Sequence, residues 1–230
     1  MLPKSVARQL KFGKSVHAKQ YEATTVYFSD IADFADISST SEPMQVVTFL
    51  NNVYSFMDAK MNMYDVYKME TIGSVYMVVS GVPVSNGQRH VVEIANLAVD
   101  ILQVTEDFVI PHMPLRPLRL RIGIHSGSCC AGVVGNKMPR YCLFGDTINT
   151  ASRMQSYGLP GKIHVSKGTR DLLEEVGGFV VEPRGRIDIK GKGDMATFWL
   201  VSKINPKNEG KKRGVVLQTD SSREAWMETA

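Results

Sequence analysis

The strongest constraint on the fold of this chain is the order in which strand-like and helix-like apolar patterns follow one another. A half-buried strand repeats every second residue and an amphipathic helix about every 3.6 residues, so the two patterns can be told apart. The first half of the chain reads as strand, helix, strand, strand, helix and strand. This β-α-β-β-α-β order is that of a ferredoxin-like core. We therefore predict an α+β fold with helices packed on a mostly antiparallel sheet and with extra helices and strands added to the core.

Local signals support the individual elements. Residues 24–28 alternate and are rich in β-formers, and residues 40–43, Thr-Ser-Glu-Pro, are typical of a helix start. Gly73 and Ser74 are a candidate two-residue hairpin turn. The remaining expectations are a helix over 46–61, strands at 67–71 and 75–79, a helix over 91–102, a strand pair formed by 118–125 and 131–134, helices from Thr147 and Ser166, and strands near Phe179, Ile187 and Thr197.

The composition favours an intracellular globular domain. The chain has 230 residues, 43% of them hydrophobic, which is enough for a core within one large domain. Its net charge of +4 is spread along the sequence apart from residues 211–213, so we expect no nucleic-acid partner. Three cysteines, two of them adjacent, cannot build a disulfide framework and favour a reducing compartment. We find no apolar run long enough for a membrane span and no signal-like N-terminus, and we expect a cytoplasmic location.

The segment 141–154, YCLFGDTINTASRM, carries the strongest functional signal. Asp146 follows a glycine and can cap a helix, because its carboxylate accepts from free N–H groups of the first turn. Asn149 and Arg153 then lie one helical turn apart on one face, while Ile148, Ala151 and Met154 can face a core. An amide and a permanent cation side by side suit an anionic ligand such as a triphosphate. Taken alone, the same spacing is also that of an ordinary solvated helix face.

This segment resembles the signature of class III nucleotide cyclases, and most closely that of the guanylate cyclase type found in receptor guanylate cyclases. The resemblance covers residues 2–202 in the family's order and spacing, which is far more specific than a single motif. It implies the class III nucleotidyl cyclase fold and conversion of GTP to 3′,5′-cyclic GMP and pyrophosphate. The other matching stretches are VYFSDIADF from Val26, VYKMETIGSVYMVVSG from Val66, LRLRIGIHSG from Leu118, AGVVGNKMPR from Ala131 and IDIKGKGDMATFWL from Ile187.

The resemblance also suggests three regions. Residues 1–20, which include a short amphipathic piece at 3–10, form an N-terminal linker or helical segment. Residues 21–203 form the guanylate cyclase catalytic domain. Residues 204–230 are polar and rich in Gly and Lys, so we expect a flexible tail.

The metal site that the resemblance implies is damaged in this chain. Asp30 matches one of the two family aspartates that hold two Mg²⁺ or Mn²⁺ ions, but Ser74 stands at the position of the second. A neutral hydroxyl is a weaker ligand than a carboxylate for these hard cations. Asp33 replaces a family glycine and lies three residues after Asp30. Asp33 could partly replace the lost carboxylate, or it could repel the triphosphate.

Two further residues imply a preference for guanine. Glu70 and Cys142 match the base-recognition residues of guanylate cyclases, where adenylate cyclases carry a lysine and an aspartate. A carboxylate can accept from both N1–H and the 2-amino group of guanine, and a thiol is a weak donor for its O6. Without the family frame, Glu70 would be an exposed strand residue and Cys142 a small core residue.

The resemblance assigns the remaining roles to three residues. Asn149 orients the ribose, Arg153 stabilises charge that develops on the α-phosphate, and Lys190 binds the outer phosphates. Arg153 would then be the main electrostatic catalyst, because phosphoryl transfer asks little covalent chemistry of the protein. By itself, the Lys-Gly-Lys-Gly run that contains Lys190 reads as a turn with solvated charges.

In this family the site lies between two catalytic domains arranged head to tail. One domain gives the metal aspartates, and the other gives the residues that hold base, ribose and phosphates. A homodimer of this chain would lack one metal carboxylate at each site, whereas a heterodimer with an intact cyclase subunit would have one complete site. Three hypotheses follow: a guanylate cyclase that is weak alone or complete with a partner, a catalytically silent GTP-binding regulatory module, and a structural dimerisation domain without nucleotide. Intact Glu70, Asn149, Arg153 and Lys190 argue against the third.

Overall fold

The computed structural model describes residues 2–135 and 137–204. The tail predicted for 204–230 therefore lies outside the described residues, except for Ile204, and so does the cationic run 211–213. The helices are α1 (Lys4–Lys11), α2 (Phe34–Ser39), α3 (Pro43–Met61), α4 (Arg89–Thr105), α5 (Asp146–Ser156) and α6 (Lys167–Val176). The strands are β1 (Lys19–Ile31), β2 (Tyr67–Ile72), β3 (Val75–Ser80), β4 (Leu120–Val134), β5 (Arg140–Phe144), β6 (Lys162–Ser166), β7 (Phe179–Ile189) and β8 (Gly193–Lys203).

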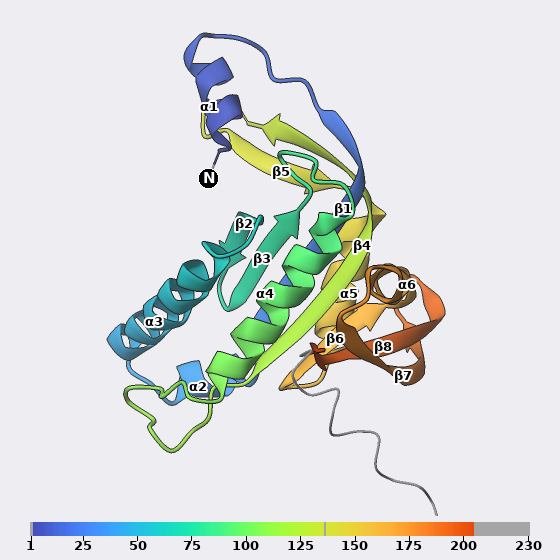
Figure 1. Cartoon of the computed structure of the whole chain (residues 1–230). Coiled ribbons are helices and arrows are strands. Elements are labelled where there is room, and N and C mark those ends of the chain that lie inside the picture. The colour runs from blue at the N-terminus through green and yellow to red at the C-terminus, as the bar shows by residue number, and fades with distance from the viewer. Residues whose placement is uncertain (1, 136, 205–230) are drawn as a thin grey trace, which may run out of the picture.

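The strands form one sheet, and its first half confirms the predicted core. The strand order is β2-β3-β1-β4-β6-β8-β7, with β5 paired to the far end of β4 (Figure 1). The elements β1, α3, β2, β3, α4 and β4 follow one another in the β-α-β-β-α-β order of a ferredoxin-like fold. Every strand pair is antiparallel except β4 with β6. The strands from β5 onward extend this core on the β4 side.

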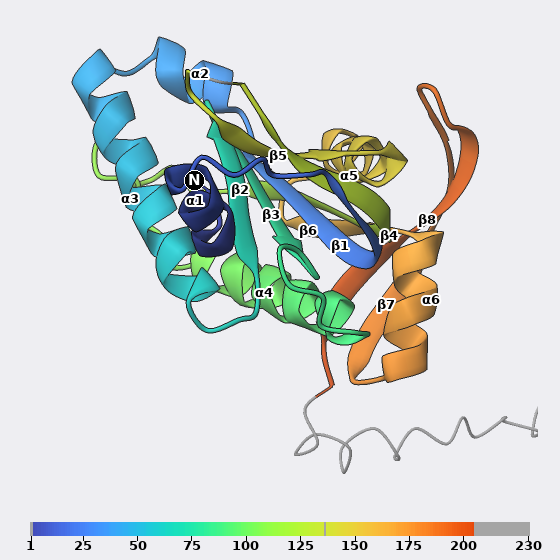
Figure 2. The ribbon, with the colours of Figure 1, turned by 90° about the horizontal axis from the view of Figure 1, so that it is seen from above.

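Helices cover both faces of the sheet. On one face, α3, α4 and α6 bury their apolar stripes against β1, β4 and β6 in the main core. On the other face, α1 and α5 pack over a second cluster that includes Val26, Cys129, Ala131, Tyr141 and Ala151 (Figure 2). The layered arrangement leaves the outer side of α5 open to solvent.

The local signals for α3 and for the β2–β3 hairpin are confirmed. Helix α3 begins at Pro43, and Glu42 and Gln45 form a reciprocal capping box. Strands β2 and β3 pair from Ile72 with Val75, so Gly73 and Ser74 make a two-residue turn. Gly73 adopts a φ of 58°, which glycine reaches without a steric cost.

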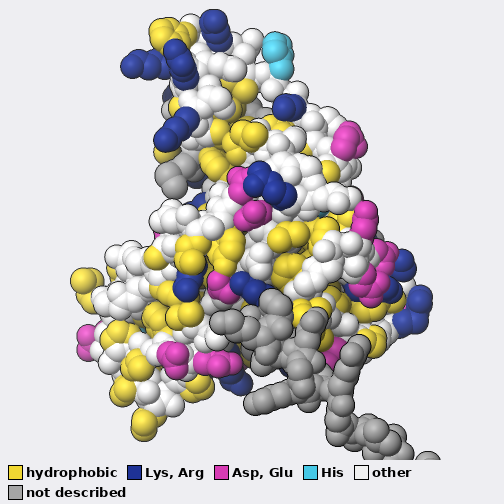
Figure 3. Space-filling view, viewed as in Figure 1, with side chains coloured by type: hydrophobic (Ala, Val, Ile, Leu, Met, Phe, Trp, Pro, Cys, Tyr) yellow, Lys and Arg dark blue, Asp and Glu magenta, His cyan; other side chains and the backbone are white. Residues whose placement is uncertain are grey.

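The amphipathic piece predicted at 3–10 is helix α1. Val6 is buried in the second cluster, while Lys4, Arg8 and Lys11 are exposed. Lys and Arg side chains gather over this end of the molecule (Figure 3). The assignment of regions 1–20 and 21–203 stays a prediction.

The strand pair predicted from 118–125 and 131–134 is wrong, because both pieces belong to the single strand β4. The backbone between the two pieces stays extended, and Gly127 pairs with β1 there. A Cβ atom on Gly127 would lie 2.6 Å from Oγ1 of Thr147 on α5. Glycine is therefore present to let α5 approach closely, and the hairpin partner of β4 is β5.

Two smaller predictions are also corrected. Asp146 is the first residue of α5 rather than its cap, which is Gly145 with a φ of 131°. The expected strands near Phe179 and Ile187 are one strand, β7, and β6 had no counterpart among the predictions. The helix predicted from Ser166 is confirmed as α6, whose first turn Ser166 caps by accepting from the N–H of Thr169.

We predict that Gly123→Ala destabilises the protein strongly. A Cβ atom on Gly123 would lie 1.9 Å from the backbone nitrogen of Gln155, so α5 would have to move off β4. Forced overpacking of this kind costs about 3 kcal/mol, measurable as a lower free energy of unfolding in urea. Gly168→Ala is the matched control. Gly168 lies in α6, and a Cβ atom there would meet no atom closer than 3.7 Å. That variant should gain about 0.5 kcal/mol, since alanine is the better helix former. Equal stability of the two variants would contradict the prediction.

Candidate functional site

Helix α5 and the turn between β7 and β8 enclose a pocket of about 410 Å³. The structure thus brings Asn149, Arg153 and Lys190 together around one pocket, although β6, α6 and β7 lie between the end of the helix and Lys190 in the sequence. The pocket is lined by Asp146, Asn149, Ser152, Arg153, Lys190, Gly191 and Lys192. Of these, the sequence analysis assigned no role in a site to Asp146, Ser152 or Lys192.

Helix α5 is seated on the sheet by its buried face. Thr147, Ala151 and Met154 are buried there, and the helix backbone rests on Gly123 of β4. Asn149 is exposed on the outer face, with Arg153 one turn later and partly covered. The predicted pairing of an amide and a cation on one helix face is therefore present.

The C-terminal end of α5 is held by two basic side chains. Nδ1 of His164 donates to the carbonyl oxygen of Met154 at 2.7 Å, and Arg184 donates to the carbonyl oxygen of Tyr157 at 2.6 Å. The guanidinium of Arg184 also lies 4.7 Å from the ring centre of Trp199. Burial lowers the pKa of His164 to about 4, and the nearby Arg184 acts in the same direction. The imidazole is therefore neutral at pH 7, with Nε2 free to accept from Arg184 at 3.2 Å.

The pocket has a surplus of positive charge. Lys192 forms an ion pair with Asp146, and this hydrogen bond holds the pKa of Asp146 below its usual value. Among the described residues, neither Arg153 nor Lys190 forms an ion pair. Two cations are thus left to face a ligand, which suits an anion with several negative oxygens.

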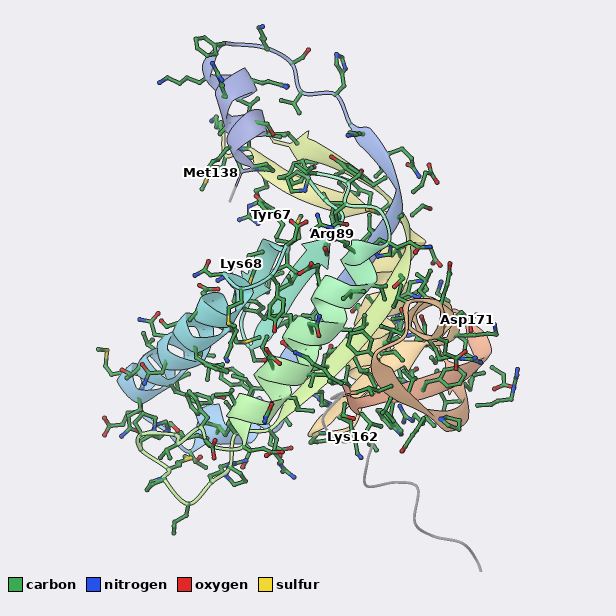
Figure 4. The ribbon with its side chains drawn as sticks, in the orientation of Figure 1. Tyr67, Lys68, Arg89, Met138, Lys162 and Asp171 are labelled. Carbon is green, nitrogen blue, oxygen red and sulfur yellow. The ribbon has the colours of Figure 1, made fainter. Side chains whose placement is uncertain are left out.

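Glu70 and Cys142 lie on neighbouring parts of β2 and β5. Nη1 of Arg140 is 3.4 Å from Oε1 of Glu70, and Cys142 follows two positions later on β5, on the same face as Arg140. The ring of Tyr67 on β2, which is labelled in Figure 4, meets that of Tyr141 on β5 edge-on. The centroids of the two rings are 6.2 Å apart, and this contact ties the two strands together. The sequence analysis missed Arg140, although its spacing from Cys142 on a strand was a usable signal.

Asp30 and Ser74 lie at adjacent ends of two paired strands. Asp30 of β1 pairs with Val75 of β3, next to Ser74, as predicted from the ferredoxin-like order. Both oxygens of Asp30 bind Arg121, at 3.0 Å from Nε and 2.5 Å from Nη2. The bond to Asp30 raises the pKa of Arg121, so this guanidinium stays charged.

Asp33 has a cationic partner of its own. Its Oδ2 lies 2.8 Å from Nη2 of Arg119, and its backbone is left-handed with a φ of 59°. A family glycine at this position would adopt that conformation freely, whereas aspartate tolerates it at some cost. The described residues contain no group of three or more His, Cys, Asp or Glu side chains that could hold a metal ion. Of the two predicted metal positions, only Asp30 carries a carboxylate, and this carboxylate is already bound to Arg121.

Within the described part of the chain, no hydrogen bond or ion pair joins Asp30 or Ser74 to Asn149, Arg153 or Lys190. The structure thus separates a metal half, at the β1 and β3 ends, from a nucleotide half at α5 and the β7–β8 turn.

Comparison with known proteins identifies the family. Residues 16–202 match the model of the adenylate and guanylate cyclase catalytic domain. The chain is 57% identical over 201 residues to human atrial natriuretic peptide receptor 2, covering 87% of this chain and 19% of the receptor. It is 56% identical over 204 residues to human retinal guanylyl cyclase 1, covering 88% of this chain and 18% of that protein. The chain thus spans about a fifth of the length of these relatives.

Solved structures give the same result. The guanylate cyclase domain of RhGC from Catenaria anguillulae, in complex with GTP, is 38% identical with a TM-score of 0.75, covering 81% of this chain and all of that one. A non-canonical dimeric guanylyl cyclase domain from Blastocladiella emersonii is 36% identical with a TM-score of 0.73, covering 81% of this chain and 99% of that one. The predicted α+β fold of class III nucleotidyl cyclases is confirmed. This chain belongs to the adenylate and guanylate cyclase catalytic domain family, and within it to the guanylate cyclases.

Proposed function

We propose that this chain acts as the nucleotide-recognition half of a guanylate cyclase site that binds GTP and converts it to 3′,5′-cyclic GMP and pyrophosphate. The observation that carries the proposal is the convergence of Asn149, Arg153 and Lys190 around one pocket with two uncompensated cations. The solved structure of the Catenaria anguillulae domain in complex with GTP supports GTP as the ligand.

Guanine would be read by Glu70 and Cys142. The carboxylate of Glu70 accepts from N1–H and the 2-amino group, and the thiol of Cys142 donates weakly to O6. Nη1 of Arg140 lies 3.4 Å from Oε1 of Glu70, and this contact limits the rotation of the carboxylate. Adenine offers the opposite pattern of donors and acceptors and would leave Glu70 facing an acceptor.

The phosphates would be held by the α5 pocket. Lys190 binds the outer phosphates, Arg153 binds the α-phosphate, and Asn149 hydrogen-bonds to the ribose. The ribose 3′-oxygen then loses its proton and bonds to the α-phosphorus, while the bond from that phosphorus to the pyrophosphate oxygen breaks. Arg153 stabilises the negative charge on the α-phosphate during this exchange, which is the electrostatic help that phosphoryl transfer needs.

The divalent metal that cyclases of this class generally use, Mg²⁺ or Mn²⁺, would come with a partner subunit. Asp30 is already paired with Arg121, Ser74 is neutral, and Asp33 is paired with Arg119. Each carboxylate is thus compensated by a guanidinium, which removes the negative field that attracts Mg²⁺. These contacts argue against Asp33 as a substitute ligand. They favour a heterodimer with a subunit that keeps both aspartates over a fully active homodimer.

The absence of a second metal carboxylate at Ser74 also favours a second function. If no metal-competent partner is available, the chain would be a silent module that binds GTP and regulates a protein attached to it. Binding of GTP without turnover, both alone and with a partner, would select this function. Failure to bind GTP would leave only a structural dimerisation domain.

The site of action that we propose is the cytoplasm, on the cytoplasmic face of the plasma membrane if the chain is part of a receptor. The relatives named above include a natriuretic peptide receptor. None of the described helices is both long and apolar enough to cross a membrane.

The decisive test is a complementation assay. The chain is mixed with a cyclase domain that keeps both metal aspartates but has lost the arginine equivalent to Arg153, and production of cyclic GMP from GTP is measured with Mg²⁺ or Mn²⁺. We expect activity only in the mixture, because only the mixed dimer has one complete site. Arg153→Ala in this chain is the control and should abolish the gain. A mixture that is no more active than either component would contradict the heterodimer.

Restoring the lost carboxylate tests the metal half on its own. Ser74→Asp should raise the turnover of the chain alone by at least about 10-fold, since tenfold corresponds to only ~1.4 kcal/mol of transition-state stabilisation. Ser74→Asn is the matched control, because it adds the same bulk without charge, and it should give no gain. If the asparagine and aspartate variants behave alike, the missing charge is not what limits turnover.

Exchange of the base-recognition pair should change the preferred nucleotide. Glu70→Lys combined with Cys142→Asp presents a donor and an acceptor that match adenine, so the ratio of GTP to ATP affinity should fall by at least about 10-fold, the effect of one unpaired buried polar group. Binding of fluorescent GTP and ATP analogues measures this ratio. Glu70→Gln, which keeps the size of the side chain, should weaken GTP binding without improving ATP binding. An unchanged ratio in the double variant would show that the base lies elsewhere.

A further inference from the structure

The three-residue turn that carries Lys190 is tied to both ends of helix α5. Lys192, at the end of the turn, forms an ion pair with Asp146, the first residue of the helix. Lys190, at its start, donates its backbone N–H to the phenol oxygen of Tyr157, which follows the last turn of the helix, at 3.1 Å. One short turn is thus attached to two points on the same helix.

The first tie joins a largely covered lysine side chain to an exposed carboxylate. The side chain of Lys192 is 20% exposed, and that of Asp146 is 73% exposed. The lysine side chain is therefore largely covered, whereas the carboxylate is open to water. Because Lys192 is engaged in this way, Lys190 is the cation of the turn that remains available to a ligand.

The second tie rests on a rigid support. The carbonyl oxygen of Tyr157 accepts from Arg184, and its backbone N–H donates to the carbonyl oxygen of Arg153 at 3.0 Å. Arg184 is itself stacked on Trp199 of β8. The phenol oxygen that holds Lys190 is therefore on a residue fixed by both β7 and α5.

The distances require both long side chains. The helix from Asp146 to Tyr157 is about 16 Å long at ~1.5 Å per residue. A three-residue turn spans about 7 Å between its first and last Cα atoms, even when extended at ~3.5 Å per residue. The turn reaches both ends of the helix only because the lysine and tyrosine side chains extend from opposite sides of the gap. This arrangement fixes the turn along the helix axis as well as across it.

We propose that Asp146 and Tyr157 are positioning residues that set where Lys190 stands relative to Arg153. The inference rests on the proposed function only in naming a triphosphate as the ligand that uses this spacing. Arg153 projects from the helix and Lys190 from the turn, so tying the turn to that helix fixes the spacing of the two cations before a ligand arrives. A preformed spacing lowers the conformational entropy that is lost on binding.

The first experiment measures the tie without any nucleotide. Amide exchange of Lys190 is followed by NMR in the unmodified chain and in Tyr157→Phe, which removes only the hydroxyl. We expect exchange to be at least about fivefold faster, because the hydrogen bond that protects this amide is worth ~1 kcal/mol. Tyr64→Phe is the matched control, because its hydroxyl binds Asp100, away from the turn. An unchanged Lys190 amide in Tyr157→Phe would overturn the proposal.

The second experiment is a double-mutant cycle on binding of a fluorescent GTP analogue. Lys190→Ala and Tyr157→Phe should each weaken binding, and Lys190→Ala should have a smaller effect in the Tyr157→Phe background than in the unmodified chain. Neither step alters Asp146, and Tyr157→Phe changes no charge, so the coupling reports position rather than long-range electrostatics. Additive effects would show that Tyr157 does not act through Lys190.

The two experiments separate the failure of this proposal from that of the proposed function. If the chain binds no GTP analogue but Lys190 exchange responds to Tyr157→Phe, the tie exists and the assignment of the ligand is wrong. If GTP binds and Lys190→Ala weakens it, but Tyr157→Phe changes neither exchange nor binding, the nucleotide site stands and the positioning role fails. Asp146→Asn is a check on the first tie. This variant should also speed amide exchange in the turn, by about twofold, because a partly exposed ion pair contributes little stability.

Discussion

The direct contact between the backbone of α5 and strand β4 is the constraint on which the site depends. It exists because Gly123 has no side chain: a Cβ atom there would lie 1.9 Å from the backbone nitrogen of Gln155. Gly127 gives the same freedom at the other end of the helix, beside Thr147. Since the helix lies directly on the strand, its outer residues Asn149 and Arg153 are held at a fixed height above the sheet. Binding groups on such a support need little reorganisation when a ligand arrives.

The sequence predicted the ferredoxin-like core because its periodic patterns report the buried faces of each element. The sequence analysis was wrong at positions whose role depends on a contact with a residue far away in the sequence. The expected strand pair at 118–134 is the single strand β4, in which Gly127 allows the close approach of a helix about 20 residues later, and no local pattern can express that contact. Asp146 reads as a helix cap, but Gly145 adopts the cap position and the carboxylate turns to Lys192. Both errors came from contacts that are distant in sequence.

In the candidate site, too, the residues within local motifs could be predicted and their distant partners could not. The residues that would touch nucleotide were predicted, since they lie within specific motifs, but the arginines and the lysine that hold the acidic residues were not. Arg121 binds Asp30, Arg140 binds Glu70, and Lys192 binds Asp146. A sequence shows that a charge is present but not which opposite charge will neutralise it, because pairing depends on the fold.

These pairings give the two halves of the site opposite electrostatic character. In the metal half, Asp30 and Asp33 each have a guanidinium partner, so no net negative charge is left for a divalent cation. In the nucleotide half, Arg153 and Lys190 have no acidic partner among the described residues, so net positive charge is left for an anion. Ser74, which we propose stands where a metal carboxylate is expected, adds no charge to the first half and does not touch the second. A chain altered in this way would still be selected for its nucleotide half if a partner supplied the metal. In the heterodimer that we propose, the cations around the pocket would be needed, whereas a second metal carboxylate at position 74 would not.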